Sequence, residues 1–286
     1  MSETILQNQT VIRLGFFFGL LTLVGLWEIL APRRALTVSK AVRWVNNLGM
    51  VFFYSWLVRL IFPLAAVGMA ELAASRSWGL LNLYPLPAWV AIPLAVIVLD
   101  LVIYLQHVMV HAVPLFWRLH RMHHADLDYD VTTGARFHPL EIILSMGIKL
   151  AAVALIGAPP VAVVIFEVVL NGMAMFNHGN IRLPLGLDSL LRLLVVTPDM
   201  HRVHHSIRPG ETNSNFGFNL SLWDRFFGTY RAQPADGHEG MTIGIREFRE
   251  PRYLWFHLLL LQPFLKNEGA YPLGRTGNEG TPHQNK

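Results

Sequence analysis

Long apolar runs constrain this 286-residue chain more than any other feature of its sequence. Three of them, at about residues 11–31, 45–70 and 88–110, approach the roughly 20 residues that a helix needs to cross the hydrocarbon of a bilayer. Charged residues make up only 15% of the chain, against about 25% in a typical soluble domain. The sequence therefore predicts an all-α, multi-pass transmembrane helical bundle.

Two shorter apolar stretches, at about residues 140–155 and 161–176, flank the sequence Gly157-Ala158-Pro159-Pro160. Glycine and proline in this arrangement favour a turn, so we expect a helical hairpin whose arms either cross the bilayer or only dip into it. A last apolar patch, within residues 251–268, suits a helix that lies at the membrane interface. Residues 269–286 are rich in glycine, asparagine and proline and predict a disordered tail.

Basic residues predict the orientation of this bundle, because short cytoplasmic loops are enriched in lysine and arginine. Four basic residues follow the first apolar run: Arg33, Arg34, Lys40 and Arg43. Only Arg76 follows the second run. We therefore expect the N-terminus outside and everything after about His107 on the cytoplasmic side of a bacterial inner membrane or an endoplasmic-reticulum-like membrane.

The histidines carry the clearest chemical signal, because eight of the thirteen fall into three clusters. The clusters are His107 with His111, then His120 with His123 and His124, then His201 with His204 and His205. Residues three or four apart share a helix face, so each cluster is expected to direct its imidazoles toward one point. Imidazole suits iron, zinc, copper or nickel, and eight ligands exceed the needs of one ion. The pattern predicts a histidine-rich dimetal cap on the cytoplasmic side of the bundle.

The type of chemistry is narrowed by motifs that the sequence lacks. It contains no HExxH motif, which disfavours a zinc peptidase, and no pair of Glu-x-x-His motifs, which disfavours a soluble carboxylate di-iron bundle. It contains no cysteine, so this chain provides neither a thiolate zinc site nor a cysteine-ligated iron–sulfur cluster. Two redox metals held by nitrogen would suit oxygen activation, whereas two zinc ions would suit hydrolysis. The histidine pattern alone does not separate these two.

The three clusters and their surroundings resemble the fatty acid hydroxylase superfamily, also called the sterol desaturase family. Five further segments are similar to that family: Asp130–Thr133, Arg136–Pro139, Asn177–Asn180, Thr197–His205, and Asn215–Gly217 leading to Trp223–Tyr230. The resemblance covers roughly residues 86–230, and the first two apolar runs match it only in being apolar. It divides the chain into N-terminal transmembrane helices at 1–86 and a catalytic region at 87–250, followed by the interfacial helix and the tail.

The resemblance implies a di-iron centre that uses O2 and external electrons to hydroxylate or desaturate a lipid C–H bond. It implies these metal ligands: His107, His111, His120, His123, His124, His178, His201, His204 and His205. His138 is expected to be either a ligand or an outer-shell group. Ligating imidazoles usually donate their second N–H to a fixed acceptor, and the candidates for this role are Asn177, Asp126, Asp199 and Glu141.

The implied partners are a lipid from the bilayer and a separate electron donor of reductase, ferredoxin or cytochrome type, with no nucleic acid. Zinc is the other metal that such a site could hold. Two alternatives therefore stay open: a membrane zinc-dependent hydrolase or lyase that uses the same histidines, and a metal carrier or sensor without catalytic activity. The sequence does not predict which lipid is bound, or whether hydroxylation or desaturation takes place.

Overall fold

The computed structural model describes residues 2–265 and 271–273. Within these residues the only β pairing consists of three isolated bridges, and the regular structure is otherwise helical. Five of the described helical segments are long and apolar enough to cross a membrane: α2 (Gln9–Leu30), Lys40–Leu83 (which contains α3 to α5), α6 (Ala88–Ala112), α8 (Pro139–Ile156) and α9 (Pro160–Asn177). This confirms the predicted all-α bundle with several candidate spans.

The second apolar run is divided rather than continuous. Helix α3 (Lys40–Ile61) ends just before Pro63, because proline has no N–H to donate and its ring clashes with the preceding turn of a helix. Ala65 then adopts a left-handed φ of 50°. The chain turns there into α4 (Ala65–Ser75), which is followed by the short α5 (Leu80–Leu83).

Helices α8 and α9 form the predicted hairpin. Gly157 ends α8 with a left-handed φ of 68°, a conformation that glycine adopts without steric cost. Gly79, before α5, packs closely on this turn: a Cβ atom there would lie 2.2 Å from the Gly157 nitrogen. Each arm has 18 residues, or about 27 Å of helix, against roughly 30 Å of hydrocarbon. Both arms are thus close to the length of a full crossing.

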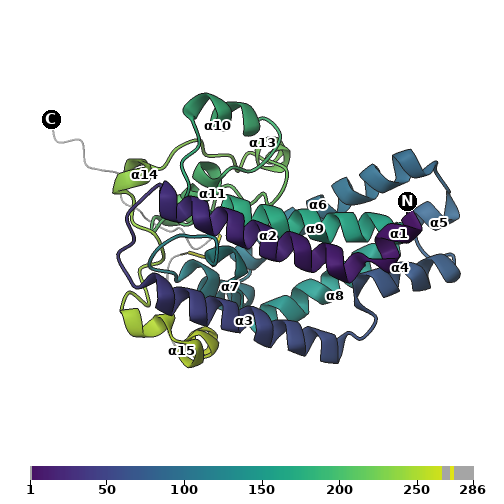
Figure 1. Cartoon of the computed structure of the whole chain (residues 1–286), viewed down its shortest axis with the longest axis horizontal. Helices are drawn as coiled ribbons and strands as arrows, with labels where there is room; N and C mark the ends of the chain where they lie inside the picture. Colours follow the sequence, from purple (N-terminus) through teal and green to yellow (C-terminus); the bar gives the residue numbers. More distant parts are fainter. Residues whose placement is uncertain (1, 266–270, 274–286) are drawn as a thin grey trace.

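The long helices lie along one direction, and the histidine-bearing segments gather at one end of the bundle, which we call the cap (Figure 1). The C-terminal ends of α2, α6 and α9 and the N-terminal ends of α3 and α8 lie at the cap, beside α7 (Pro114–His124) and α11 (Pro198–His204). The N-terminus, α4 and α5 lie at the opposite end. Because successive long helices run in opposite directions, histidines from distant parts of the sequence reach the same end.

The interior of the bundle is built largely from small and β-branched residues of α4, α6, α8 and α9, such as Ala70, Ala95, Ala162 and Val163. Small side chains let helices approach closely, as is common between transmembrane helices. Large apolar side chains are instead found on the outer faces; Leu30, for example, is 82% exposed. A bundle of this kind presents a hydrocarbon surface to lipid.

The short helix α1 (Ser2–Gln7) lies at the end opposite the cap (Figure 1). The other short elements are η1 (Thr133–Ala135), α10 (Leu185–Leu191), α12 (Pro209–Thr212), α13 (Leu222–Phe226), α14 (Gly237–Gly240), η2 (Pro251–Leu254), α15 (Phe256–Leu261) and η3 (Gln262–Phe264). The expected interfacial helix at 251–268 is therefore three short pieces as far as residue 265. Its last three residues lie outside the described part. Leu259 of α15 packs on Met50 of α3 and Met122 of α7, which ties this segment to the bundle.

Most of the expected disordered tail, 269–286, lies outside the described residues. Its described part, residues 271–273, differs from that expectation because Tyr271 is fully buried. The Tyr271 hydroxyl donates to the Ile207 carbonyl (2.9 Å) and accepts from the Arg246 backbone N–H (2.8 Å). Its ring stacks on Trp117. An aromatic residue that packs in this way gives the chain a reason to be ordered at this point.

Candidate metal centre

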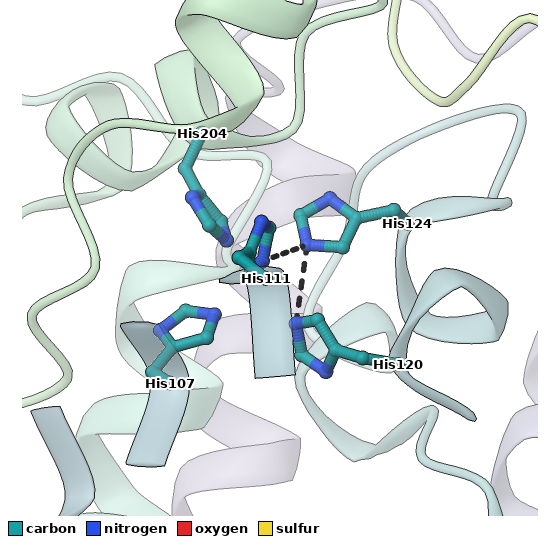
Figure 2. A group of neighbouring side chains, drawn as sticks. All are labelled: His107, His111, His120, His124 and His204. Carbon is teal, nitrogen blue, oxygen red and sulfur yellow. Dashed lines mark hydrogen bonds between the residues drawn. The ribbon is translucent and has the colours of Figure 1, made fainter. Parts of the chain in front are cut away.

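Nine buried histidines converge in two groups at the cap. The first group consists of His107, His111, His120, His124 and His204 (Figure 2). The second group consists of His123, His178, His201 and His205. Within each group, one ring nitrogen per residue lies within 4.8 Å of the others. These are the nine residues expected as ligands, so the sequence clusters do meet in space, while ligation itself stays a prediction.

The two HxxHH motifs are each divided between the groups, which differs from the expectation that each would point to one place. On α7, His120 and His124 belong to the first group and His123 belongs to the second. On α11, His201 belongs to the second group and His204 belongs to the first. His205, directly after α11, belongs to the second group. The reason is geometric: adjacent residues are about 100° apart around a helix, so neighbouring histidines cannot face the same point. Each motif thereby bridges the two groups.

The inward-facing nitrogens lie at the spacing expected of ligands to one ion. His124 Nε2 is 3.1 Å from His111 Nε2 and 3.2 Å from His120 Nε2 (Figure 2). Nitrogens bound at about 2.1 Å to one tetrahedral or octahedral ion lie about 3.0–3.4 Å apart. Within the described chain, Nε2 of His107 and of His204 is buried without a hydrogen-bond partner. In the second group, Nε2 of His201 and of His205 is also buried without a partner among the described residues. One metal ion in each group would satisfy these atoms, so the residues fit a two-metal centre.

Backbone carbonyls orient three of the rings. Each accepts a hydrogen bond from the Nδ1–H of one histidine at 2.7 Å: Phe216 from His107, Ala174 from His178 and Ser214 from His204. Because a carbonyl can only accept, the proton must lie on Nδ1, which leaves Nε2 free for a metal. No side-chain pattern in the sequence could have revealed these partners.

Two further rings of the first group are held by side chains. His120 Nδ1 lies 2.6 Å from Glu141 Oε1, and His111 Nδ1 lies 3.1 Å from Asn213 Oδ1. Glu141 was among the expected acceptors for the second N–H of a ligating imidazole. Asn213 was not expected, because an isolated asparagine in a loop carries no recognisable signal.

Asp224 holds the loop that supplies the carbonyl to His107. Its two carboxylate oxygens accept from the backbone N–H groups of Phe216 (2.8 Å) and Gly217 (2.9 Å), and Oδ1 also accepts from the Thr229 hydroxyl (2.7 Å). Thr229 in turn lies 2.8 Å from the Tyr104 hydroxyl on α6. The Trp223–Tyr230 segment therefore contributes to the first histidine group indirectly, by fixing the surroundings of His107.

The remaining candidates lie outside both groups. His138 caps α8, where its Nδ1 accepts from the Leu140 N–H, and its Nε2 donates to the Leu260 carbonyl at 3.3 Å. Asn177 donates to the Phe218 carbonyl.

Asp199 forms ion pairs with Arg33 and Arg202. The isolated histidines are placed as follows: His238 lies 3.7 Å from Asp199, His257 is exposed, and His283 lies outside the described residues.

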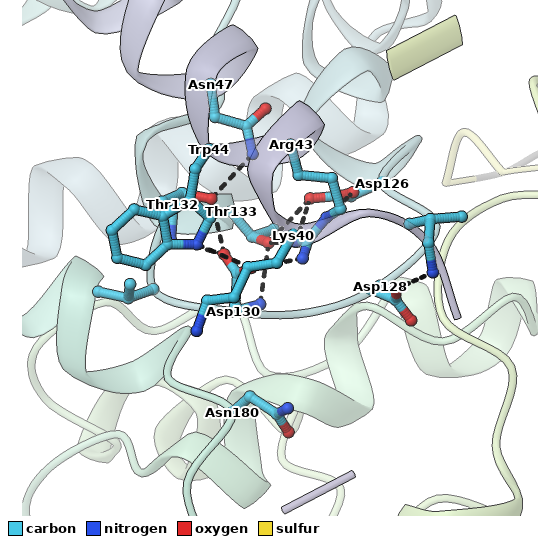
Figure 3. Close-up of polar contacts among 12 residues, drawn as sticks. Lys40, Arg43, Trp44, Asn47, Asp126, Asp128, Asp130, Thr132, Thr133 and Asn180 are labelled. Atoms are coloured by element: carbon cyan, nitrogen blue, oxygen red, sulfur yellow. Dashed lines mark hydrogen bonds and ion pairs between the residues drawn. The ribbon is translucent and has the colours of Figure 1, made fainter. Parts of the chain in front are cut away.

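Asp126 was expected as an acceptor for a ligating imidazole, but it instead pairs with Arg43 of α3 (Figure 3). Both of its carboxylate oxygens accept from the Arg43 guanidinium at 2.8 Å, and Arg43 also pairs with Asp130. Burial alone would raise the pKa of Asp126, but the guanidinium groups of Arg43 and Arg136 lower that pKa to about 2. This buried network joins α3 to the segment between α7 and α8. From the sequence, Arg43 was expected only as one of the basic residues that follow the first apolar run.

The rings of the second group are neutral in the metal-free protein. Burial, reinforced by neighbouring imidazoles, lowers the pKa of His178 to about 3 and the pKa of both His201 and His205 well below the usual range. Neutral imidazole is the form that binds a metal. Because the unfolded chain would protonate these groups near their ordinary pKa of 6.5, the metal-free cap loses stability as the pH falls below that value.

A cavity of about 1040 Å³ reaches the first group from within the bundle. His107 and His120 line one of its ends, together with Phe137 and Glu141. From there it extends between α2, α3, α4, α8 and α9. A molecule bound in this space would lie beside the first group, between the helices of the bundle.

Replacing one histidine of each group by alanine tests the two-metal arrangement. We expect His204→Ala and His201→Ala each to lower the metal content of the purified protein from about two ions to about one per chain, because each removes a ligand from one group only. Elemental analysis by mass spectrometry measures this. His257→Ala, on an exposed ring, is the matched control and should keep both ions. Full metal content in both cap variants would contradict the arrangement.

Removing Arg43 tests whether its buried ion pairs with Asp126 and Asp130 stabilise the fold. Arg43→Met leaves two buried carboxylates without their main partner, so we expect the free energy of unfolding in detergent to fall by about 3–5 kcal/mol. The deficit should be largest above pH 4 and shrink toward pH 2, because the lowered pKa of Asp126 stabilises the fold only while the carboxyl is ionised. Arg182→Met, at an exposed position, is the control. An equal effect of both substitutions would refute the role given to Arg43.

Known proteins similar to this chain include several enzymes of lipid metabolism. Ornithine lipid hydroxylase OlsE of Rhizobium tropici is 29% identical over 185 residues, which are 64% of this chain and 54% of that protein. Human alkylglycerol monooxygenase is 34% identical over 157 residues, which are 54% of this chain and 34% of that protein. A very-long-chain aldehyde decarbonylase of rice, GL1-1, is 28% identical over 194 residues, 63% of this chain and 31% of that protein.

The chain thus spans about half or less of the length of these curated relatives. No solved structure matches it. The fatty acid hydroxylase family matches residues 92–229, a stretch that begins in α6 and ends beyond α13 and contains all nine converging histidines. The likeness to the fatty acid hydroxylase family is therefore shown for this histidine-bearing region, which is just under half of the chain.

Proposed function

We propose that this protein is a membrane-bound oxygenase that holds two iron ions and uses O2 to hydroxylate or desaturate a C–H bond of a lipid. The observation that carries this proposal is the convergence of nine buried imidazoles in two adjacent groups, one of which borders a large cavity inside a lipid-facing bundle. Two relatives are named as a lipid hydroxylase and a monooxygenase, which supports an oxidative reaction over hydrolysis.

Bound iron would supply the redox chemistry that activates dioxygen. The side chains of this protein would hold the ions and align the substrate. Glu141 keeps the proton of His120 on Nδ1, and the carbonyls of Phe216 and Ser214 do the same for His107 and His204. The cavity would keep a hydrocarbon chain against this group in a fixed orientation, which contributes strongly to rate by lowering the entropy that the reaction must lose.

The electrons would come from a separate protein. The chain has no cysteine to ligate an iron–sulfur cluster, so a reductase, ferredoxin or cytochrome is the proposed donor. Its docking site would lie on the cap, because α7 and α11, which carry five of the nine histidines, lie at that end of the bundle (Figure 1).

Comparative lipidomics of cells with and without the gene tests the reaction. We expect the protein to generate a lipid that has gained one oxygen or lost two hydrogens, and His204→Ala to abolish that product because it removes a ligand of the first group. His257→Ala should retain the product. Persistence of the product in the His204→Ala cells would count against the proposal. Stoichiometric zinc with turnover in the absence of oxygen would favour a hydrolase or lyase instead.

We further propose that the cap lies on the cytoplasmic side. Because the chain has no native cysteine, single cysteines can report this. Ser75→Cys, at the end opposite the cap, should react with a membrane-impermeant maleimide on intact cells. Glu250→Cys, in the cap, should react only after permeabilisation. Both side chains are at exposed positions, and the reverse labelling pattern would place the cap outside.

A further inference from the structure

A charged cluster lies inside the bundle, away from the cap. Arg13 of α2, Lys149 of α8 and Glu167 of α9 all belong to candidate membrane spans. Lys149 Nζ lies 2.8 Å from Glu167 Oε1, and the Arg13 guanidinium lies 2.5 Å from Glu167 Oε2. The side chains of Lys149 and Glu167 are 11% and 7% exposed. Ionisable groups within spans are energetically unfavourable and usually mark a functional site.

This cluster has an excess of positive charge and an unused donor. Two cations share one carboxylate, and each oxygen of Glu167 already binds one of them. Arg13 Nε is buried without a hydrogen-bond partner among the described residues. A buried donor without an acceptor is destabilising. A bound anion would both balance the charge and accept from this atom.

The same cavity that reaches the histidines also reaches the charged cluster. Arg13, Lys149 and Glu167 line one part of it, and His107 and His120 line another. Apolar side chains such as Ile103, Val67, Met146 and Leu170 also line the cavity, alongside the polar side chains of Gln106, Ser145 and Asn171. Glu141, at the histidine end, and Lys149 are eight residues apart on α8, or about 12 Å. The cavity therefore connects the charged cluster to the histidines, and part of its wall between α6, α8 and α9 is apolar.

From these features we infer that the cavity binds an acyl or alkyl amphiphile by its anionic head group, a carboxylate or a phosphate, which lies against Arg13 and Lys149. Its hydrocarbon chain then runs along the apolar walls toward His107 and His120. The reverse orientation would leave the charged cluster facing hydrocarbon, which is unfavourable. Under the proposed function, on which this step rests, the oxidised carbon is separated from the head group by about 12 Å of chain and is not next to it.

Binding of three defined probes tests the head-group site. Palmitate, hexadecyl phosphate and hexadecanol carry the same chain with a carboxylate, a phosphate and an uncharged head. We expect the full metal-loaded protein, in a neutral detergent at pH 8, to bind at least one of the two acids about tenfold or more tightly than hexadecanol. The acid that binds more tightly identifies the head-group chemistry. Equal affinity for all three probes would overturn the inference.

Two substitutions separate anion binding from a purely structural ion cluster. Arg13→Gln should abolish the preference for the acids while leaving hexadecanol binding unchanged, and Arg13→Lys should restore it. Glu167→Gln should tighten binding of the acids, because it removes the carboxylate that competes for Arg13 and Lys149. Arg76→Gln, at an exposed position, is the control. If Glu167→Gln weakened the acids and hexadecanol alike, the cluster would be structural only and the inference wrong.

Metal content and oxygen uptake, measured on the same samples, keep this inference apart from the proposed function. Selective binding of acids by a protein that takes up no iron would leave the head-group site standing and remove the oxygenase. Lipid oxidation by a protein without preference for either acid would support the oxygenase and overturn the head-group site.

Discussion

The mutual approach of buried imidazoles is the constraint on which the rest of this structure depends. His124 Nε2 lies 3.1 Å from His111 Nε2 and 3.2 Å from His120 Nε2, and all three side chains are buried. Such an arrangement is unfavourable unless a cation lies between the rings, because buried polar atoms without partners destabilise a fold. The two histidine groups are thus best understood as ligand sets whose geometry is fixed before the metal arrives.

Helix directions, ring hydrogen bonds and more distant ion pairs together hold the imidazoles in place. Alternating helix directions bring one end of α6 and α9 to the cap, and α7 and α11 each contribute to both histidine groups. Outside the rings, Glu141 and backbone carbonyls fix the imidazole protons. Further out, Asp224 fixes the loop at Phe216, and the ion pair of Arg43 with Asp126 fixes the segment after α7. Each layer restricts the one inside it, as metal sites generally require.

Helix type, approximate spans and the nine converging histidines were predictable from the sequence, because apolar runs and three- or four-residue spacings act locally. The division of HxxHH between two groups was not expected, although helical geometry explains it once both groups are known. Tertiary partners were harder to predict. Arg43 and Asp126 are 83 residues apart and meet only in the fold, and the backbone acceptors of His107 and His204 have no side-chain signature. Pro63 and Tyr271 altered the expected boundaries through local backbone chemistry and aromatic packing, respectively.

Anomalous X-ray diffraction from crystals of the purified protein, with data collected on both sides of the iron absorption edge, would test the central claim most directly. The account predicts two anomalous peaks in the cap, one among the five histidines of the first group and one among the four histidines of the second. A single peak shared by both groups, or strong peaks placed away from these rings, would contradict it.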